Sequence, residues 1–204
     1  MIDLLQRRRA MMMGSGGSLP YDAEVEYLYG DSNQYIETGI IPDADTGMMA
    51  DIKRGNTSDT YIFGLRNDSG NTRWCIGNPL YYGYGGYSGT SPIIPTETRI
   101  EVCLNYLNDK LFRIPYNGHS VQLPSLSFTP AFNIRLFGSA GRVSTTVSKW
   151  AGYIYAAKIT QGSNIVMDLI PVRVGTTGYM YDRISGQLFG NDGTGDFGLG
   201  NDKN

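Results

Sequence analysis

Charge, histidine, cysteine and long apolar runs are all scarce in this chain. Charged side chains make up 18% of the 204 residues, and the formal net charge is −2. A balance this close to neutral gives no overall attraction to nucleic acid or to anionic membranes, so neither is expected as a partner. No stretch approaches the ~20 consecutive apolar residues of a membrane-spanning helix.

The scarce reactive residues also exclude several classes of enzyme. His119 is the single histidine and follows the Asn117-Gly118 pair, so it is expected at an exposed hairpin tip. A Ser-His-Asp triad would have to use it, and no G-x-S-x-G motif accompanies it. Cys75 and Cys103 have no zinc-site spacing. Each suits a buried position as a small apolar side chain, and a disulfide between them stays an alternative.

What the chain does contain favours β-structure. Tyrosine occurs 15 times and glycine 27 times, and aromatic residues reach 12%. Aromatic side chains fit pleated surfaces, and glycine permits tight turns. A chain of this length forms one domain with a substantial core, and it needs neither a disulfide nor a metal to fold.

Short segments of alternating polarity follow one another after residue 20. Strands are expected at residues 25–29, 34–40, 47–53, 60–66, 73–77, 98–106, 132–138, 150–160 and 165–174, with a hairpin turn at Asn117-Gly118. Many short strands between close turns indicate an antiparallel sandwich or barrel. The predicted fold class is therefore all-β, with a globular domain over residues 21–204.

Residues 1–20 form a predicted N-terminal arm with a Gly/Ser linker. Its apolar and basic side chains could share one short amphipathic helix: Leu4, Leu5, Arg7, Arg8, Arg9, Met11, Met12 and Met13. One interpretation is an arm that anchors the protein on another subunit, and the other is a disordered tail. The apolar run after the arginines is too short for a secretory signal, so synthesis in the cytoplasm is expected.

Three phrases of the sequence resemble a known family. "QYIETG" at residues 34–39, "YIFGLR" at 61–66 and the closing run "DLIPVRVGTTGYMYDRISGQLFGNDGTGDF" at 168–197 are similar to motifs of concanavalin A-like, LamG-type jelly-roll domains from gut Bacteroidales and their phages. The "YGDSN" before the first phrase departs from the family's usual wording. The resemblance spans residues 24–200 and implies a sandwich of two antiparallel sheets, a fold that hosts many functions.

The carboxylates give no support to catalysis. Catalytic sandwiches of this type carry E-x-D-x-E along one strand, and that motif is absent here. The chain has five glutamates, of which Glu24 and Glu26 would share one face of a strand. We expect them on a solvated edge. The protein is therefore predicted not to be an enzyme.

Two acidic loops raise the question of calcium, which prefers oxygen ligands. They are "PDADTG" at residues 42–47 and "NDGTGD" at 191–196. Asp and Asn beside Gly are also what tight turns require, and turns are the favoured interpretation. Neither a metal nor a cofactor is predicted, with calcium kept as a lesser alternative. Residues 178–200 are then expected to form two short strands and a last strand at 196–197.

The tyrosine-rich run at residues 78–90 is the predicted binding surface. Tyr81, Tyr82, Tyr84 and Tyr87 are separated by glycines, and Trp74 lies just upstream. Tyrosine offers a flat apolar ring and a hydroxyl, which suit sugars and protein interfaces alike. The alternative is a strand pair whose tyrosines cover the sandwich.

The family context and the basic, methionine-rich start favour a non-enzymatic phage virion component. A head fibre, decoration protein or tail appendage would be anchored through residues 1–20. Its expected partners are other virion proteins and further copies of itself. The alternative is a lectin-like, carbohydrate-binding module that recognises bacterial or host glycans, with the bacterial cell surface as the alternative location.

Overall fold

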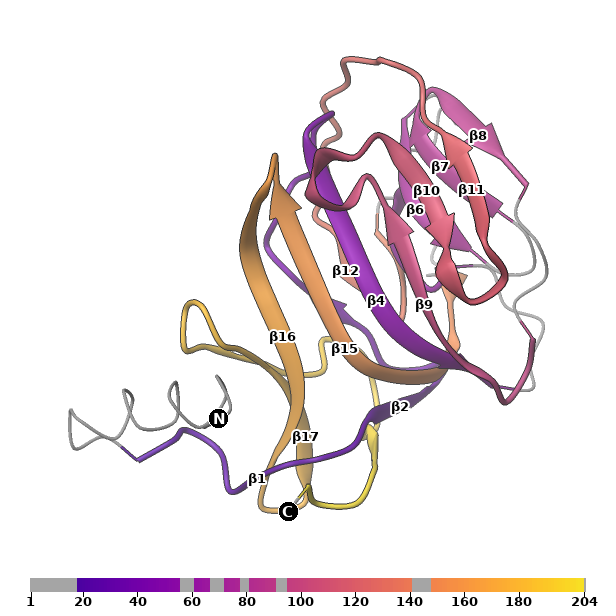
Figure 1. The fold of residues 1–204 in the computed structure, drawn as a ribbon. Coiled ribbons are helices and arrows are strands. Elements are labelled where there is room, and N and C mark those ends of the chain that lie inside the picture. Colours follow the sequence, from indigo (N-terminus) through magenta and orange to yellow (C-terminus); the bar gives the residue numbers. More distant parts are fainter. Residues whose placement is uncertain are drawn as a thin grey trace, which may run out of the picture.

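The chain folds as two antiparallel β-sheets packed face to face (Figure 1). The computed structural model describes residues 18–55, 61–66, 72–77, 81–90, 95–140 and 148–203. Within them, regular structure is almost entirely strand, with two short 3-10 turns, η2 (Tyr106–Asn108) and η3 (Pro115–Asn117). The predicted all-β sandwich is confirmed. No helix of the described residues has the length and apolar composition to cross a bilayer.

The larger sheet curves across the molecule and carries its longest strands. Its strands are β1 (Ala23–Glu24), β2 (Leu28–Asp31), β4 (Thr46–Arg54), β9 (Arg99–Leu104), β10 (Leu111–Ile114), β11 (His119–Gln122), β15 (Ala151–Gln161), β16 (Asn164–Val174), β17 (Thr177–Asp182), β18 (Leu188–Phe189) and β19 (Gly198–Leu199). Over the described ranges the main order is β11-β10-β9-β4-β15-β16-β17-β18. β1 pairs with β16, and β2 pairs with β15 and β19.

The smaller sheet lies against one half of the larger one. Its order is β3 (Ile36–Glu37), β12 (Arg135–Leu136), β5 (Phe63–Arg66), β6 (Arg73–Gly77), β7 (Tyr81–Gly85) and β8 (Tyr87–Gly89). A separate pair joins β13 (Gly138–Ser139) to β14 (Ser148–Lys149). The two main sheets meet where the ring of Tyr82 stacks on that of Phe112, with 4.3 Å between centroids.

Alternation along each strand builds the core. On β4, Met48, Ala50 and Ile52 are buried, whereas Asp51 and Lys53 on the other face remain partly exposed. The period of two places every second side chain in the space between the sheets. The predicted strands at 47–53, 73–77, 98–106, 150–160 and 165–174 are confirmed with small shifts of their ends.

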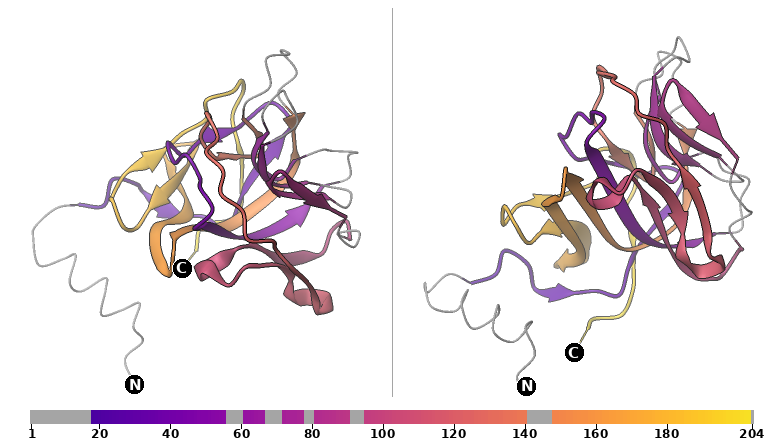
Figure 2. Two further views of the ribbon diagram at one scale, coloured as in Figure 1. Left: turned by 90° about the horizontal axis from the view of Figure 1, so that it is seen from above. Right: turned by 45° about the horizontal axis from the view of Figure 1, so that its top comes forward.

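The C-terminal segment closes the larger sheet. β17 and β18 match the two short strands predicted in residues 178–200. The last strand is β19, and it lies two residues beyond the predicted 196–197. It pairs with β2, so the end of the chain returns to a strand near its beginning (Figure 2). Phe197 is buried in the core, where its side chain helps to fix this return.

The predicted strand at 34–40 is wrong beyond β3, because another loop takes its backbone hydrogen bonds. The amide N–H of Tyr35 donates to Asn191 Oδ1 (3.1 Å), and that of Glu37 donates to Asp192 Oδ2 (2.8 Å). The amide N–H of Asp192 donates in turn to the carbonyl of Tyr35 (2.8 Å). The first and last of the three phrases that carry the family resemblance therefore bind each other across about 155 residues.

Of the strand predicted at 25–29, only the last two residues are strand, at the start of β2. β1 ends at Glu24 and β2 begins at Leu28. Between them Val25 bridges to Asp202, and the amide N–H of Glu26 donates to the carbonyl of Asn201 (2.9 Å). The C-terminal residues thus pair with the segment between β1 and β2.

Both cysteines are free thiols in the described structure, and both are buried. Cys75 on β6 and Cys103 on β9 point away from the core on different sheets, so a disulfide between them is excluded by the fold. Burial raises the pKa of each thiol to about 12. At neutral pH both are therefore protonated and shielded.

We expect neither thiol to react with an alkylating reagent while the protein is folded, because the thiolate is the nucleophile. Mass spectrometry after iodoacetamide treatment at pH 8 should show unmodified protein. The same treatment in guanidinium chloride should modify both cysteines. Rapid labelling of one cysteine in the native protein would contradict its burial.

Candidate functional site

Most aromatic side chains predicted to form a binding surface are buried in the core instead. Trp74 and Tyr84 have no exposed surface, and Tyr82 is 2% exposed. The indole N–H of Trp74 donates to the carbonyl of Thr46 (3.3 Å), and the hydroxyl of Tyr84 donates to that of Ala44. A ring without an exposed face cannot receive a sugar. The prediction of a ligand surface is therefore wrong for these three side chains, which join the two sheets instead.

The other two predicted tyrosines lie on opposite faces of the smaller sheet. Tyr87 is paired with Tyr84 at the edge strand β8 and is 37% exposed. Tyr81 is paired with Gly77 and points away from the core. The strand period of two separates them, so they do not form one binding surface. The predicted anchoring arm, Leu4 to Met13, lies outside the described residues and stays a prediction.

Tyr81 belongs to a different cluster that the sequence did not predict. Its ring packs edge-on against that of Tyr61 (5.8 Å), and the guanidinium of Arg73 lies over it at 5.6 Å. The guanidinium of Arg66 donates to the Tyr61 hydroxyl (2.8 Å), and that of Arg73 donates to the Ser88 hydroxyl (3.3 Å). We call these five residues the tyrosine–arginine face.

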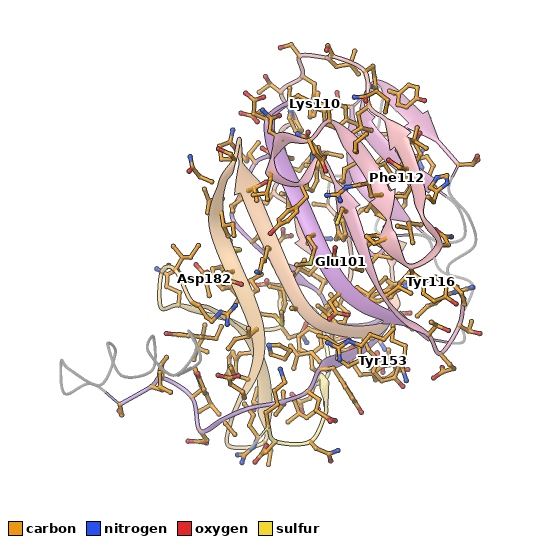
Figure 3. The ribbon with its side chains drawn as sticks, in the orientation of Figure 1. Glu101, Lys110, Phe112, Tyr116, Tyr153 and Asp182 are labelled. Atoms are coloured by element: carbon orange, nitrogen blue, oxygen red, sulfur yellow. The ribbon has the colours of Figure 1, made fainter. Side chains whose placement is uncertain are left out.

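The outer face of the larger sheet carries a second aromatic cluster, where Tyr153 is marked in Figure 3. The ring of Tyr153 packs against Tyr27 (4.9 Å), and Lys53 lies over it at 4.1 Å. Arg99 covers Tyr155 at 4.0 Å. The signal in the sequence was the alternation in "EYLYG" and "GYIYA". Because a cation covers each of these two rings, this cluster offers them poorly to a ligand.

The acidic loops serve as turns in the structure. Asp43 Oδ1 accepts hydrogen bonds from the Asp45 amide (2.9 Å), the Thr46 hydroxyl (2.9 Å) and the Gln161 amide (3.0 Å). Asn191 Oδ1 likewise accepts from Gly193 (2.8 Å) as well as from Tyr35. Over the ranges that the structure describes, no group of three or more His, Cys, Asp or Glu residues is arranged to hold a metal ion.

The single histidine is not at an exposed tip as predicted. His119 begins β11, and its ring is half-buried with its edge toward Phe112, 5.7 Å between centroids. The hairpin itself is confirmed, since η3 and Gly118, with φ 70°, join β10 to β11. The ring packs on the sandwich because β11 follows the turn directly.

An open groove of about 700 Å³ lies where β3 of the smaller sheet approaches the end of the β16–β18 region. Its volume falls within the roughly 300–1,000 Å³ typical of small-molecule sites. The lining comes from five segments: Glu37, Thr38, Gly39, Ile40, Asn133, Gln161, Val166, Met167, Asp182, Ser185, Gln187 and Phe189. Asp182, marked in Figure 3, lies at the end of β17 beside this groove.

The groove offers unbonded planar polar groups beside apolar surface. Among the described residues, the side-chain amides of Asn133 and Gln187 make no hydrogen bond. Oε2 of Glu37 also lacks a partner, but it is buried and does not face the groove opening. Phe189 packs half-buried against the core, and Val166 is 39% exposed. Side-chain amides donate and accept hydrogen bonds in one plane, which suits two neighbouring hydroxyl groups of a sugar. Apolar side chains suit the C–H faces of a sugar ring.

The two carboxylates of the groove are both engaged in structure. Asp182 is 1% exposed and accepts from the backbone N–H groups of Asp168 (2.8 Å), Ile184 (3.1 Å) and Ser185 (3.0 Å). Burial by itself would raise the pKa of Asp182, but these hydrogen bonds lower it below its usual value. Glu37 pairs with the guanidinium of Arg135.

Comparison with known structures supports the fold. The chain is similar to a crystal structure of a candidate carbohydrate-binding protein from Bacteroides ovatus ATCC 8483, with 13% identity and a TM-score of 0.57. The match covers 86% of this chain but 60% of that protein, so this chain spans well under the whole of its length. No family model matches the chain. No curated protein sequence matches it either.

Sequence reasoning missed the groove because its residues come from distant segments. Gln187 and Phe189 fall in the closing run "YDRISGQLFG", which was interpreted as strand and turn. Asn133 precedes β12, about 55 residues earlier in the chain. Neither segment carries a recognisable spacing, and only the return of β17 and β18 beside β3 brings them together.

Proposed function

We propose that this protein is a non-catalytic carbohydrate-binding module whose site is the groove beside β3 and β18. The observation that carries the proposal is the pair of unbonded side-chain amides of Asn133 and Gln187 next to Phe189 in the groove. Such a site binds by hydrogen bonds to sugar hydroxyls and by packing of ring C–H groups on Phe189. The structural neighbour, described as a candidate carbohydrate-binding protein, supports the proposal through its fold.

The chemistry of the groove favours binding over hydrolysis. A glycosidase needs a carboxylic acid with a raised pKa and a second free carboxylate. Here the pKa of Asp182 is lowered, and three backbone N–H groups occupy its oxygens. The carboxylate of Glu37 is held by Arg135. Neither group is arranged to donate a proton to a leaving glycoside oxygen, so we propose that the bound glycan is released unchanged.

The virion role inferred from the sequence depends on the arm at residues 1–20. Most of that arm is outside the described residues, and the comparisons contribute nothing to this role. It stays a prediction that concerns where the module is displayed, and it is compatible with glycan binding by the globular domain.

Glycan-array screening of the purified full chain tests the proposal. We expect binding to at least one glycan, and titration calorimetry should then show that Gln187→Ala and Asn133→Ala each raise Kd about 5–10-fold. That factor corresponds to about 1 kcal/mol, the net contribution of a typical hydrogen bond.

Gln122→Ala is the matched control, because Gln122 lies on β11 at the opposite edge of the larger sheet and its replacement should leave Kd unchanged. If the folded protein binds no glycan on a broad array, the proposal is wrong. Equal losses in all three variants would place the site elsewhere.

A further inference from the structure

Two arginines stand directly opposite each other on the tyrosine–arginine face. Arg66 on β5 and Arg73 on β6 are register partners, and both point away from the core. Side chains in such a pair have Cβ atoms about 4.5–5.5 Å apart, and like charges there destabilise the sheet. Within the described ranges, no carboxylate forms an ion pair with either guanidinium.

Arginines elsewhere on the sheets show how this chain ordinarily compensates such charges. Arg135, on the same face of the smaller sheet, pairs with Glu37. On the larger sheet Arg99 pairs with Asp51 (2.6 Å), and Arg173 pairs with Asp202 (2.6 Å). Arg66 and Arg73 therefore differ from these three arginines, because no described carboxylate pairs with them.

The described groups around the pair add no negative charge. The thiol of Cys75 lies on the same side of β6, and burial raises its pKa to about 12, so it is neutral. Burial also raises the pKa of Tyr81. The hydrogen bond to Tyr61 raises the pKa of Arg66, which stays charged at any physiological pH. The five residues of the tyrosine–arginine face therefore present two positive charges among neutral hydroxyl groups.

We propose that the tyrosine–arginine face is a second binding site, separate from the groove, for the carboxylate or sulfate group of an acidic polysaccharide. An oxyanion between Arg66 and Arg73 would accept from both guanidinium forks, as bidentate pairs of this kind do. The Ser88 hydroxyl, which already reaches Arg73, is an additional donor.

The surroundings favour a sugar over a peptide or a nucleic acid. β6 is hydrogen-bonded on both sides, to β5 and to β7, so a peptide cannot add to it as a strand. Gly83 lies between Cys75 and Ser88 without a side chain, and a Cβ there would come within 2.7 Å of Arg73 Cβ. This glycine lets the side chains of Arg73, Cys75 and Tyr81 pack closely together over the strand. A nucleic acid would require more positive charges than two.

Titration calorimetry on the purified full chain tests the site with three probes: an oligogalacturonate, a sulfated heparin oligosaccharide and a neutral xylo-oligosaccharide. We expect one of the two acidic probes to bind, and its identity shows whether carboxylate or sulfate is preferred. Arg66→Gln and Arg73→Gln should each raise its Kd at least tenfold. Arg73→Lys keeps the positive charge but loses the bidentate guanidinium, and it should raise Kd by a smaller factor.

Arg99→Gln removes an arginine of the larger sheet that has a carboxylate partner, and it should leave Kd unchanged. Gln187→Ala in the groove should also leave acidic binding unchanged, which separates this site from the proposed glycan groove. The inference is overturned if neither acidic probe binds, or if the Arg66 and Arg73 variants bind as wild type does. It is also overturned if an acidic peptide or single-stranded DNA binds more tightly than both probes.

Discussion

Replacing Trp74 by alanine is expected to lower the free energy of unfolding by about 3–5 kcal/mol, the usual cost of removing a buried tryptophan. The side chain has no exposed surface, and its ring lies 6.1 Å from that of Phe63. Its N–H donates to the carbonyl of Thr46 on the opposite sheet. A domain of this size has only about 5–15 kcal/mol of stability, so the loss is a large fraction. Denaturant unfolding should show a lower midpoint with an unchanged slope.

Tyr87→Ala provides the comparison, because Tyr87 is 37% exposed on the edge strand β8. Its ring contacts Tyr82 at 6.0 Å, and its loss should cost less than about 1 kcal/mol. If Trp74→Ala unfolds at the wild-type midpoint but loses glycan binding, then Trp74 is a ligand contact and its placement in the core is wrong.

The tyrosine-rich run at residues 78–90 shows which features of the structure the sequence could and could not predict. For residues 78–90 the sequence predicted a binding surface, with a strand pair as the alternative, and β7 and β8 form that strand pair. The sequence did not indicate which face each ring takes, because that depends on the register with β6. Tyr82 is opposite Ile76 and therefore points inward, whereas Tyr81 is opposite Gly77 and points outward. One residue of register decides between core and surface.

The sequence predicted the secondary structure correctly where neighbouring residues form the hydrogen bonds. It failed where residues far apart in the chain form them. The turn at Asn117-Gly118 was correctly predicted because adjacent residues form it. The strand expected at 34–40 is short because Asn191 and Asp192, far along the chain, bind the backbone of Tyr35 and Glu37. The same return of the C-terminal segment assembles the groove. A single sequence contains the residues of such a site, but it does not show that they lie close together in the fold.

Asp182→Asn is expected to lower the free energy of unfolding by about 2–4 kcal/mol at pH 7, because hydrogen bonds to a charged acceptor contribute about 1.5–3 kcal/mol each. The carboxylate accepts three backbone N–H groups and holds the turn that carries Ser185 and Gln187 at the groove. An asparagine amide has one acceptor oxygen and would turn its NH₂ toward a donor. Asp192→Asn, at an exposed turn with one hydrogen bond from Glu37, should cost about 1 kcal/mol.

The effect of Asp182 should depend on pH in a defined direction. Its folded pKa is lowered, so its contribution is present above the unfolded value of about 3.9 and is lost as the pH falls through the folded value. The amide N–H of Asp168 donates to Asp182, and the carboxylate of Asp168 is itself paired with Arg183 (2.7 Å). The difference in stability between wild type and Asp182→Asn should therefore be constant from pH 7 to about pH 5 and shrink below pH 4. A difference that stays the same down to pH 2 would mean that the hydrogen bonds of Asp182 do not depend on its charge.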